Sequence, residues 1–293
     1  MQRTSFLRGS STVLFALTTS STPRLVAAQS PPEAPFAQLE KRYGGTLGVS
    51  ALDTQSGNAI AYRENERFAM CSTFKFFLVA DILKRIEGGT LTSNQWVPYT
   101  SDELLEYAPV TRAHVAQGGM TVTSLCAAAI ELSDNTAGNL LLSLVGGPAG
   151  ATAYVRSLGD DVTRLDRDEP ELNSAIPGDP RDTTRPFAMR NLMSVILFGS
   201  ALNAKSVDQL IAWMGESKTS LDSLRAGLPK SWKAGDKSGS GRNNATNDIA
   251  VAWPPGRKPV LITAYYVGSN ASYDDRRTVL RTVAEYVAST LAR

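Results

Sequence analysis

Segments with strand character lie near both ends of this 293-residue chain, and a long helical stretch separates them. Strands are expected at 46–53, 59–63, 231–238, 247–253 and 260–267. Helices are expected near 36–43, 72–87, 122–131, 135–144, 149–157, 185–198, 204–215 and 273–291. One sheet built from both chain ends is therefore expected, with a functional site where the helical insert meets that sheet.

The residues Cys-Ser-Thr-Phe-Lys at 71–75 open the first helix of that insert. Residues three apart share a helix face, so Lys75 can project beside the Ser72 hydroxyl. A serine is a weak nucleophile until a neighbouring group takes or positions its proton, and a desolvated lysine can do so. The alternative interpretation is a helix cap followed by a surface lysine. Three aromatic neighbours instead favour a buried lysine that needs a polar partner: Phe74, Phe76 and Phe77.

Composition excludes several functional classes. The chain has 30 basic and 28 acidic residues and no dense basic run, so we expect neither nucleic acid nor an anionic membrane as partner. A usual zinc site needs more ligands than His114, Cys71 and Cys126 supply, and we expect no metal or cofactor. His114 is expected to be structural, because no Gly-x-Ser-x-Gly motif accompanies it. The cysteines could pair, but small buried thiols are expected.

Residues 1–28 have the features of an export signal. Arg3 and Arg8 precede a short apolar run at 12–17, and Val26-Ala27-Ala28 forms a small-residue cleavage site; the alternative is a disordered tail. No other apolar run is long enough to span a bilayer. We therefore expect a soluble, monomeric bacterial protein in the periplasm or outside the cell.

Two clusters in the helical middle carry further chemistry. At Ser133-Asp134-Asn135, between two helices, the hydroxyl could relay a proton and the carboxamide could bind a substrate amide; the alternative is a helix cap. The charged loop at 162–185 is long for a compact domain, which makes it a functional candidate. Within it, the side chains four residues apart could hold one water between them: Glu169 and Asn173.

A third cluster lies on a strand near the C-terminus. Lys237-Ser238-Gly239-Ser240-Gly241 combines a cation, hydroxyls and glycines that permit close backbone approach. This combination is suited to binding a substrate carboxylate.

In this order and at these separations, the motifs resemble those of the class A serine β-lactamases: Ser-x-x-Lys, Ser-Asp-Asn and Lys-Thr-Gly, the last present here as Lys-Ser-Gly. The resemblance covers essentially the whole chain after the signal. It implies an α/β (α+β) fold with an antiparallel five-stranded sheet flanked by terminal helices. This sheet domain would comprise 29–64 and 219–293, and an all-α domain at 65–218 would include the 162–185 loop.

The resemblance implies hydrolysis of the β-lactam ring of penicillins and cephalosporins, and thus antibiotic resistance. By match, Ser72 is the acylated nucleophile with Lys75 as its partner, Ser133 relays a proton to the lactam nitrogen, and Glu169 is the deacylation base. Substrate-binding roles fall on Asn135, Asn173, Lys237, Ser238, Gly239, Ser240, Tyr107 and Arg277. The Ser72 and Ser240 backbone N–H groups would form the oxyanion hole. The base in acylation, Lys75 or Glu169, stays open.

Departures from the family pattern are informative. Val79 and Gly241 stand where relatives carry cysteines that pair with Cys126 and Cys71, so neither bridge is expected. Thr246 stands where many relatives carry an arginine, and Arg277 is expected to take its place near the substrate carboxylate. The resemblance also implies an ion pair across the neck of the 162–185 loop, between Arg167 and Asp182.

Two alternative functions are weighed against hydrolysis. A penicillin-binding DD-peptidase shares the first motifs but needs no base for deacylation of the lactam adduct. A catalytically inactive binding module would not need to retain the full set of Ser72, Lys75, Ser133, Glu169 and Lys237. Turnover of penicillin distinguishes a β-lactamase from a DD-peptidase, which penicillin blocks. Labelling with a fluorescent penicillin tests for an inactive binding module.

Overall fold

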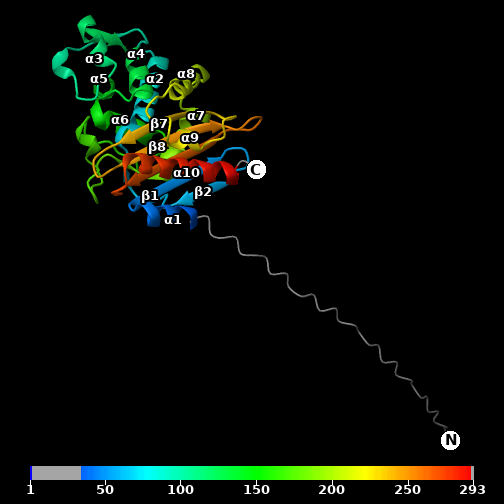
Figure 1. Ribbon diagram of the computed structural model, residues 1–293. Coiled ribbons are helices and arrows are strands. Elements are labelled where there is room, and N and C mark those ends of the chain that lie inside the picture. The colour runs from blue at the N-terminus through cyan, green and yellow to red at the C-terminus, as the bar shows by residue number, and fades with distance from the viewer. Residues whose placement is uncertain (2–33, 292–293) are drawn as a thin grey trace. The chain divides into compact units, whose positions relative to one another are not determined.

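The computed structural model, which describes Met1 and residues 34–291, contains one five-stranded sheet in the order β2-β1-β9-β8-β7 (Figure 1). All neighbouring strands are antiparallel, and β1 pairs with β9 from Thr46 opposite Val267 to Asp53 opposite Val260. The sheet built from both chain ends is thus confirmed. Its strands are β1 (Thr46–Asp53), β2 (Ala59–Tyr62), β7 (Lys233–Ser240), β8 (Thr246–Trp253) and β9 (Val260–Val267). β7 runs two residues later than expected, and β8 starts one residue earlier.

Alternating side chains of the central strands enter two cores on opposite faces of the sheet. In β8, Ile249 and Val251 belong to one core, whereas Ala250 and Ala252 belong to the other. The second core also contains side chains of α1 (Ala34–Tyr43), α9 (Leu224–Gly227) and α10 (Tyr273–Leu291). Figure 1 shows α10 lying along this face, with α1 beside the N-terminal strands. Packing on both faces leaves β1, β8 and β9 almost continuously buried.

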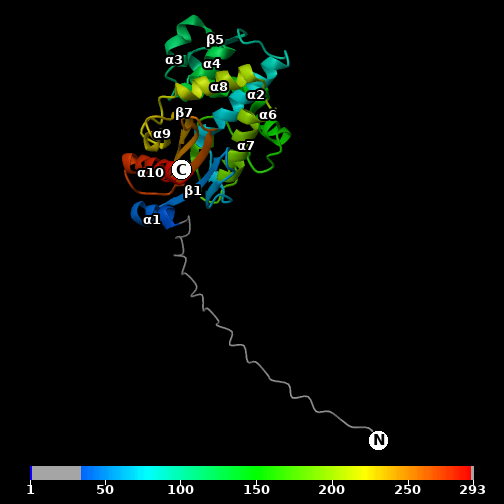
Figure 2. The ribbon, with the colours of Figure 1, turned by 90° about the vertical axis from the view of Figure 1, so that its right-hand side faces the viewer.

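The first core is shared with the helical region. Its central helix α2 (Lys75–Glu87) is buried from Lys75 to Leu83. It packs against α4 (Val122–Glu131), α5 (Asn135–Val145), α6 (Gly147–Ser157) and α8 (Ala204–Gly215), of which Figure 2 labels α4, α6 and α8 around it. A helix that is covered on nearly all sides has apolar residues around its whole circumference. The remaining expected helices are confirmed as α4 (Val122–Glu131), α5 (Asn135–Val145), α6 (Gly147–Ser157), α7 (Pro186–Phe198) and α8 (Ala204–Gly215).

Short elements escaped the sequence analysis. The short helix α3 (Thr111–His114) is one, and two ribbons are others: β3 (Phe68–Ala69) with β6 (Thr183–Thr184), and β4 (Trp96–Pro98) with β5 (Gly119–Thr121). Elements this short show no periodicity. The β3–β6 ribbon matters for the site, because it joins the segment before Ser72 to the end of the 162–185 loop. The Met70 N–H extends the connection by donating to the Asp182 carbonyl over 2.9 Å.

The expected export signal at 1–28 lies outside the described residues, apart from Met1. Residues described from 34 onward belong to one compact unit. The division into a sheet domain and a helical domain at 64/65 and 218/219 stays a prediction. Within the described part of the chain, no helix is long and apolar enough to cross a membrane.

Candidate active site

Ser72 lies in a tight 3-10 turn, η1 (Cys71–Phe74), that leads directly into α2. The edge strand β7 runs against this turn at backbone distance. A Cβ atom on Gly239 would lie 2.7 Å from the Met70 carbonyl oxygen and 3.0 Å from the Ser72 nitrogen. Glycine is therefore required at position 239, which confirms the close approach expected from the third motif. From β8, Asn247 Nδ2 holds the preceding segment by donating to the Ala69 and Met70 carbonyls at 2.9 and 3.2 Å.

The Ser72 hydroxyl contacts two ionisable groups. Lys75 Nζ donates to Ser72 Oγ over 3.0 Å, and Ser72 Oγ donates to Glu169 Oε1 over 3.2 Å. The Lys75 and Glu169 side chains are fully buried and form an ion pair at 3.0 Å. Burial lowers the pKa of Lys75, an effect that the Glu169 carboxylate partly offsets. The hydroxyl is thus held between a cation with weakened proton affinity and a carboxylate, as nucleophilic activation requires.

Ser133 connects this cluster to the second buried lysine. Its backbone carbonyl accepts from Lys75 Nζ at 2.8 Å, and its Oγ accepts from Lys237 Nζ at 2.9 Å. Burial, followed by the charge of Lys75, lowers the pKa of Lys237 to about 7. The turn also serves as a helix cap, since Asp134 accepts from the Ala137 N–H at the start of α5. This turn therefore caps α5 through Asp134 and also places Ser133 in contact with Lys75 and Lys237.

Asn135, at the first position of α5, presents its Oδ1 to Lys75 Nζ at 2.7 Å. One turn later on this helix, Asn139 holds the backbone of Glu169. Its Oδ1 accepts from the Glu169 N–H and its Nδ2 donates to the Glu169 carbonyl, both at 2.9 Å. Sequence reasoning missed Asn139. The available signal was its spacing of four from Asn135, which places both carboxamides on one helix face.

Within the 162–185 loop, Asn173 lies beside the Glu169 carboxylate. Its Nδ2 donates to Glu169 Oε2, whereas its Oδ1 is buried with no hydrogen-bond partner among the described residues. Buried acceptors in folded proteins are almost always satisfied, often by an ordered water. The structure thus brings the two side chains into direct contact, and the water expected between Glu169 and Asn173 stays a prediction.

The neck of this loop is closed by the expected ion pair. Arg167 Nε lies 2.6 Å from Asp182 Oδ2, and Asp182 is only 1% exposed. Asp182 Oδ1 also accepts from the Asp166 and Arg167 N–H groups at 2.7 and 3.0 Å. Arg167 further donates to Ser174 Oγ at 2.9 Å. The pair is thus the centre of a mostly buried network and not an exposed surface contact.

A cleft of about 470 Å³ opens above Ser72. The candidate residues that line it are Ser72, Tyr107, Ser133, Asn135, Asn173, Ser238, Gly239, Ser240 and Arg277. The other three, Lys75, Glu169 and Lys237, are buried and hydrogen-bonded to lining residues. Tyr107 is half exposed at the rim. The sequence therefore identified most of the cleft, but it missed four residues that also line it: Leu132, Lys218, Thr219 and Tyr273.

Arg277 is fixed at one end of the cleft by three contacts. Its Nη2 donates to the Thr219 carbonyl at 2.9 Å, its guanidinium forms an ion pair with Asp222, and it lies 4.9 Å from the Tyr273 ring centre. The neighbouring Arg276, and not Arg277, donates to the Thr246 hydroxyl, at 3.0 Å. Arg277 thus reaches the cleft from the start of α10 without contact to that strand position.

Three residues were expected to have structural roles: Cys71, Cys126 and His114. Cys71 and Cys126 are free and buried, as expected. A Cβ on Gly241 would lie 2.6 Å from Cys71 Sγ, so position 241 does adjoin this thiol. His114 Nδ1 lies 2.9 Å from the Val110 carbonyl, a local contact within its own turn. No group of three or more potential metal ligands occurs in the described part of the chain.

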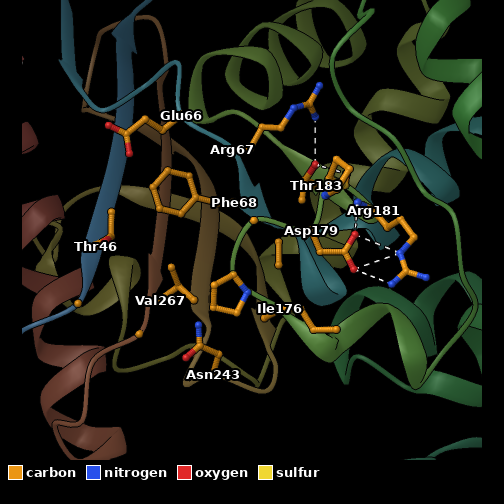
Figure 3. Close-up of a pocket in the computed structure, with 17 residues that line it drawn as sticks. Thr46, Glu66, Arg67, Phe68, Ile176, Asp179, Arg181, Thr183, Asn243 and Val267 are labelled. Atoms are coloured by element: carbon orange, nitrogen blue, oxygen red, sulfur yellow. Dashed lines mark hydrogen bonds and ion pairs between the residues drawn. The ribbon is translucent and has the colours of Figure 1, made fainter.

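A second cavity, of about 560 Å³, lies between β3, the end of β9 and residues 175–181 (Figure 3). Phe68, Ile176 and Val267 surround it, and its acidic Asp179 pairs with Arg181 at 2.7 Å. None of the twelve candidate residues lines this cavity. The chemistry therefore belongs to the cleft above Ser72.

Comparison with known proteins identifies the family of this chain, and the match extends over residues 31–291. A profile of the "Beta-lactamase enzyme family" matches residues 31–291. The chain is 45% identical to beta-lactamase CTX-M-8 of Citrobacter amalonaticus, over 94% of each chain. It is 49% identical to beta-lactamase L2 of Stenotrophomonas maltophilia, over 85% of this chain and 82% of that one.

A solved structure of an ancestral (GNCA) class A β-lactamase is 52% identical and superposes with a TM-score of 0.87, covering 88% of this chain and 99% of the other. The fold class expected from the sequence is thereby confirmed. The family match, the identities and the geometry around Ser72 agree. The chain belongs to the β-lactamase enzyme family and is a class A β-lactamase.

Proposed function

We propose that this enzyme opens the β-lactam ring of penicillins and cephalosporins through an ester on Ser72, which water then hydrolyses. The observation that carries the proposal is the contact of Ser72 Oγ with both Lys75 Nζ and Glu169 Oε1, at 3.0 and 3.2 Å. This cluster supplies a nucleophile, a proton acceptor and a base at one end of a cleft.

In acylation, Ser72 Oγ bonds to the lactam carbonyl carbon and the C–N bond breaks. Both groups that contact Ser72 Oγ can take its proton, Lys75 when neutral and Glu169 as the carboxylate. The leaving nitrogen receives the proton of the Ser133 hydroxyl, which regains one from the Lys237 ammonium that donates to it. The backbone N–H groups of Ser72 and Ser240 stabilise the oxyanion; close packing of Gly239 against the Ser72 turn supports this assignment.

Substrate binding uses the two ends of the cleft. Lys237 and Ser238 bind the substrate carboxylate, assisted by Arg277, because cations and hydroxyl donors pair with carboxylate oxygens. Asn135 binds the side-chain amide of the substrate, and Tyr107 covers the rim with a half-exposed ring.

Deacylation separates a hydrolase from a protein that penicillin merely blocks. A water held by Glu169 and Asn173 loses a proton to the Glu169 carboxylate and attacks the ester carbonyl; Ser72 then leaves with a proton. The partnerless Oδ1 of Asn173 supports this water position. A DD-peptidase or an inactive binding module would have no use for a carboxylate in contact with Ser72.

The Glu169→Gln variant tests this proposal. It keeps the shape of the side chain but removes the base, so a penicillin should acylate Ser72 and remain attached. Mass spectrometry of the intact protein should show a lasting adduct of one substrate mass, with a burst of product and then a rate reduced about 10²–10⁴-fold. Glu171→Gln, in the exposed part of the same loop, is the matched control and should turn over like the parent. Steady turnover by Glu169→Gln without an adduct would overturn the role of Glu169.

We further propose that the mature enzyme is an exported bacterial monomer that begins at Gln29, in the periplasm or the medium. The support is the signal-like pattern at 1–28. N-terminal sequencing and the solution mass of the protein recovered from those compartments test the proposal. An unprocessed Met1 or a dimer mass would contradict it.

A further inference from the structure

Residues 217–222 lie in the connection from α8 to α9. This connection runs along one side of the cleft. Two hydrogen bonds anchor it: the Lys218 N–H donates to the Glu131 carbonyl at the end of α4, at 2.9 Å, and Ser220 Oγ donates to Asp236 Oδ2 on β7, at 2.8 Å. Thr219 lies between these anchors and lines the cleft. Its position is thus fixed with respect to both the helical region and the edge strand.

Thr219 contacts two of the groups assigned to the substrate carboxylate. Its Oγ1 is 2.7 Å from Ser238 Oγ, and its carbonyl accepts from Arg277 Nη2 at 2.9 Å. The serine hydroxyl has a single proton and can rotate freely unless a neighbour fixes it. A carboxylate can only accept hydrogen bonds, so Ser238 binds it well only when its proton points into the cleft.

We propose that Thr219 is a positioning residue for substrate binding. Its hydroxyl donates to Ser238 Oγ, which leaves the Ser238 proton for the substrate carboxylate, and its carbonyl holds Arg277 toward the same end of the cleft. This inference rests on the proposed function, because it assumes that Ser238 and Arg277 bind that carboxylate. Thr219 acts through these two residues and takes no part in bond making.

Thr219→Val tests the hydroxyl alone. Valine has nearly the same shape, and the backbone carbonyl that binds Arg277 remains. The loss of one ordinary hydrogen bond corresponds to an effect of about 2- to 10-fold. We expect KM for a penicillin and a cephalosporin to rise by that factor with kcat almost unchanged, the pattern of lost ground-state binding. Thr219→Ser restores a hydroxyl and should bring KM back toward the parent value.

Two further measurements distinguish a positioning role of Thr219 from a purely structural one. With a substrate whose carboxylate is methylated, Thr219→Val and the parent should have equal KM, because the group that Ser238 serves is gone. In a Ser238→Ala background, Thr219→Val should have no further effect on KM. An unchanged KM in Thr219→Val, an equal loss with the methyl ester, or no recovery in Thr219→Ser would each overturn the inference. If Glu169→Gln forms no Ser72 adduct, the proposed function fails; an adduct together with unaffected Thr219→Val kinetics refutes only the role of Thr219.

Discussion

The Asn139→Leu variant tests whether Asn139 holds the general base, Glu169, in place. The Asn139 carboxamide makes two hydrogen bonds of 2.9 Å to the backbone of Glu169, one to its N–H and one to its carbonyl. Leucine has similar bulk and can make neither bond. The Glu169 side chain itself is unchanged, so any kinetic effect reports its placement.

The expected magnitude follows from the number of bonds lost. Two hydrogen bonds, each worth about 0.5–1.5 kcal/mol, together stabilise the held loop by about 2 kcal/mol. At 1.4 kcal/mol per factor of ten, the ratio of correctly placed to displaced Glu169 falls about 30-fold. Deacylation should slow by up to that factor, whereas acylation should suffer less, because Lys75 keeps its contacts with Ser133 and Asn135.

Rapid quenching followed by mass spectrometry measures both rates directly. The variant should accumulate acyl-enzyme during penicillin turnover, while the parent should not. The matched control is Ser143→Ala, one turn further along α5, where the exposed hydroxyl bonds only to the Leu140 carbonyl of its own helix. A deacylation rate within about two-fold of the parent, combined with a melting temperature lowered by roughly 4–8 °C, would refute the reasoning and leave Asn139 a purely structural role.

Three more outcomes are expected. Arg167→Ser leaves the buried Asp182 carboxylate without its cation, at a cost of up to about 3 kcal/mol, so it should lower the melting temperature and slow penicillin hydrolysis. Arg181→Ser breaks the pair of the half-exposed Arg181 with Asp179, outside the Asp182 network, and should change neither quantity; equal behaviour of the two variants would contradict the argument. Arg277→Ala should raise KM for cephalosporins more than it lowers kcat, and parental parameters would mean that Lys237 and Ser238 suffice. Because burial and Lys75 lower the pKa of Lys237 to about 7, its ammonium form predominates below that pH, and affinity for a carboxylate-bearing substrate should decline as pH rises through it. A KM that stays flat from one unit below to one unit above this pKa would exclude Lys237 as the titrating carboxylate ligand.

Local signals predicted a large part of this molecule. Periodicity located the long helices and the strands of the sheet within a few residues, and Gly239 marked the place where two backbone segments nearly touch. The role of such residues depends on neighbours close in sequence or on their own stereochemistry. Motif spacing similarly identified the residues around Ser72.

Residues that act across the fold could not be found in this way. Asn139 meets Glu169 thirty residues later, and Thr219 meets both Ser238 and Arg277, from another strand and another helix. The spacing of Asn139 from Asn135 indicates only a shared helix face, and Thr219 belongs to no motif. Their partners are known only once the tertiary structure brings them together. The β3–β6 ribbon is hidden for the same reason, since its two-residue strands are separated by more than one hundred positions.

The pairing of β1 with β9 also dictates the order in which the molecule can be completed. β1 leaves the ribosome long before β9, and β9 lies between β1 and β8 in the sheet. Until the residues from Val260 onward are available, the central position of the sheet is empty, and β1 has only β2 as a partner strand. Such distant pairing makes folding slow, because a loop of about two hundred residues must close before these contacts form. In a nascent chain of this topology the sheet therefore stays incomplete until β9 has been synthesised.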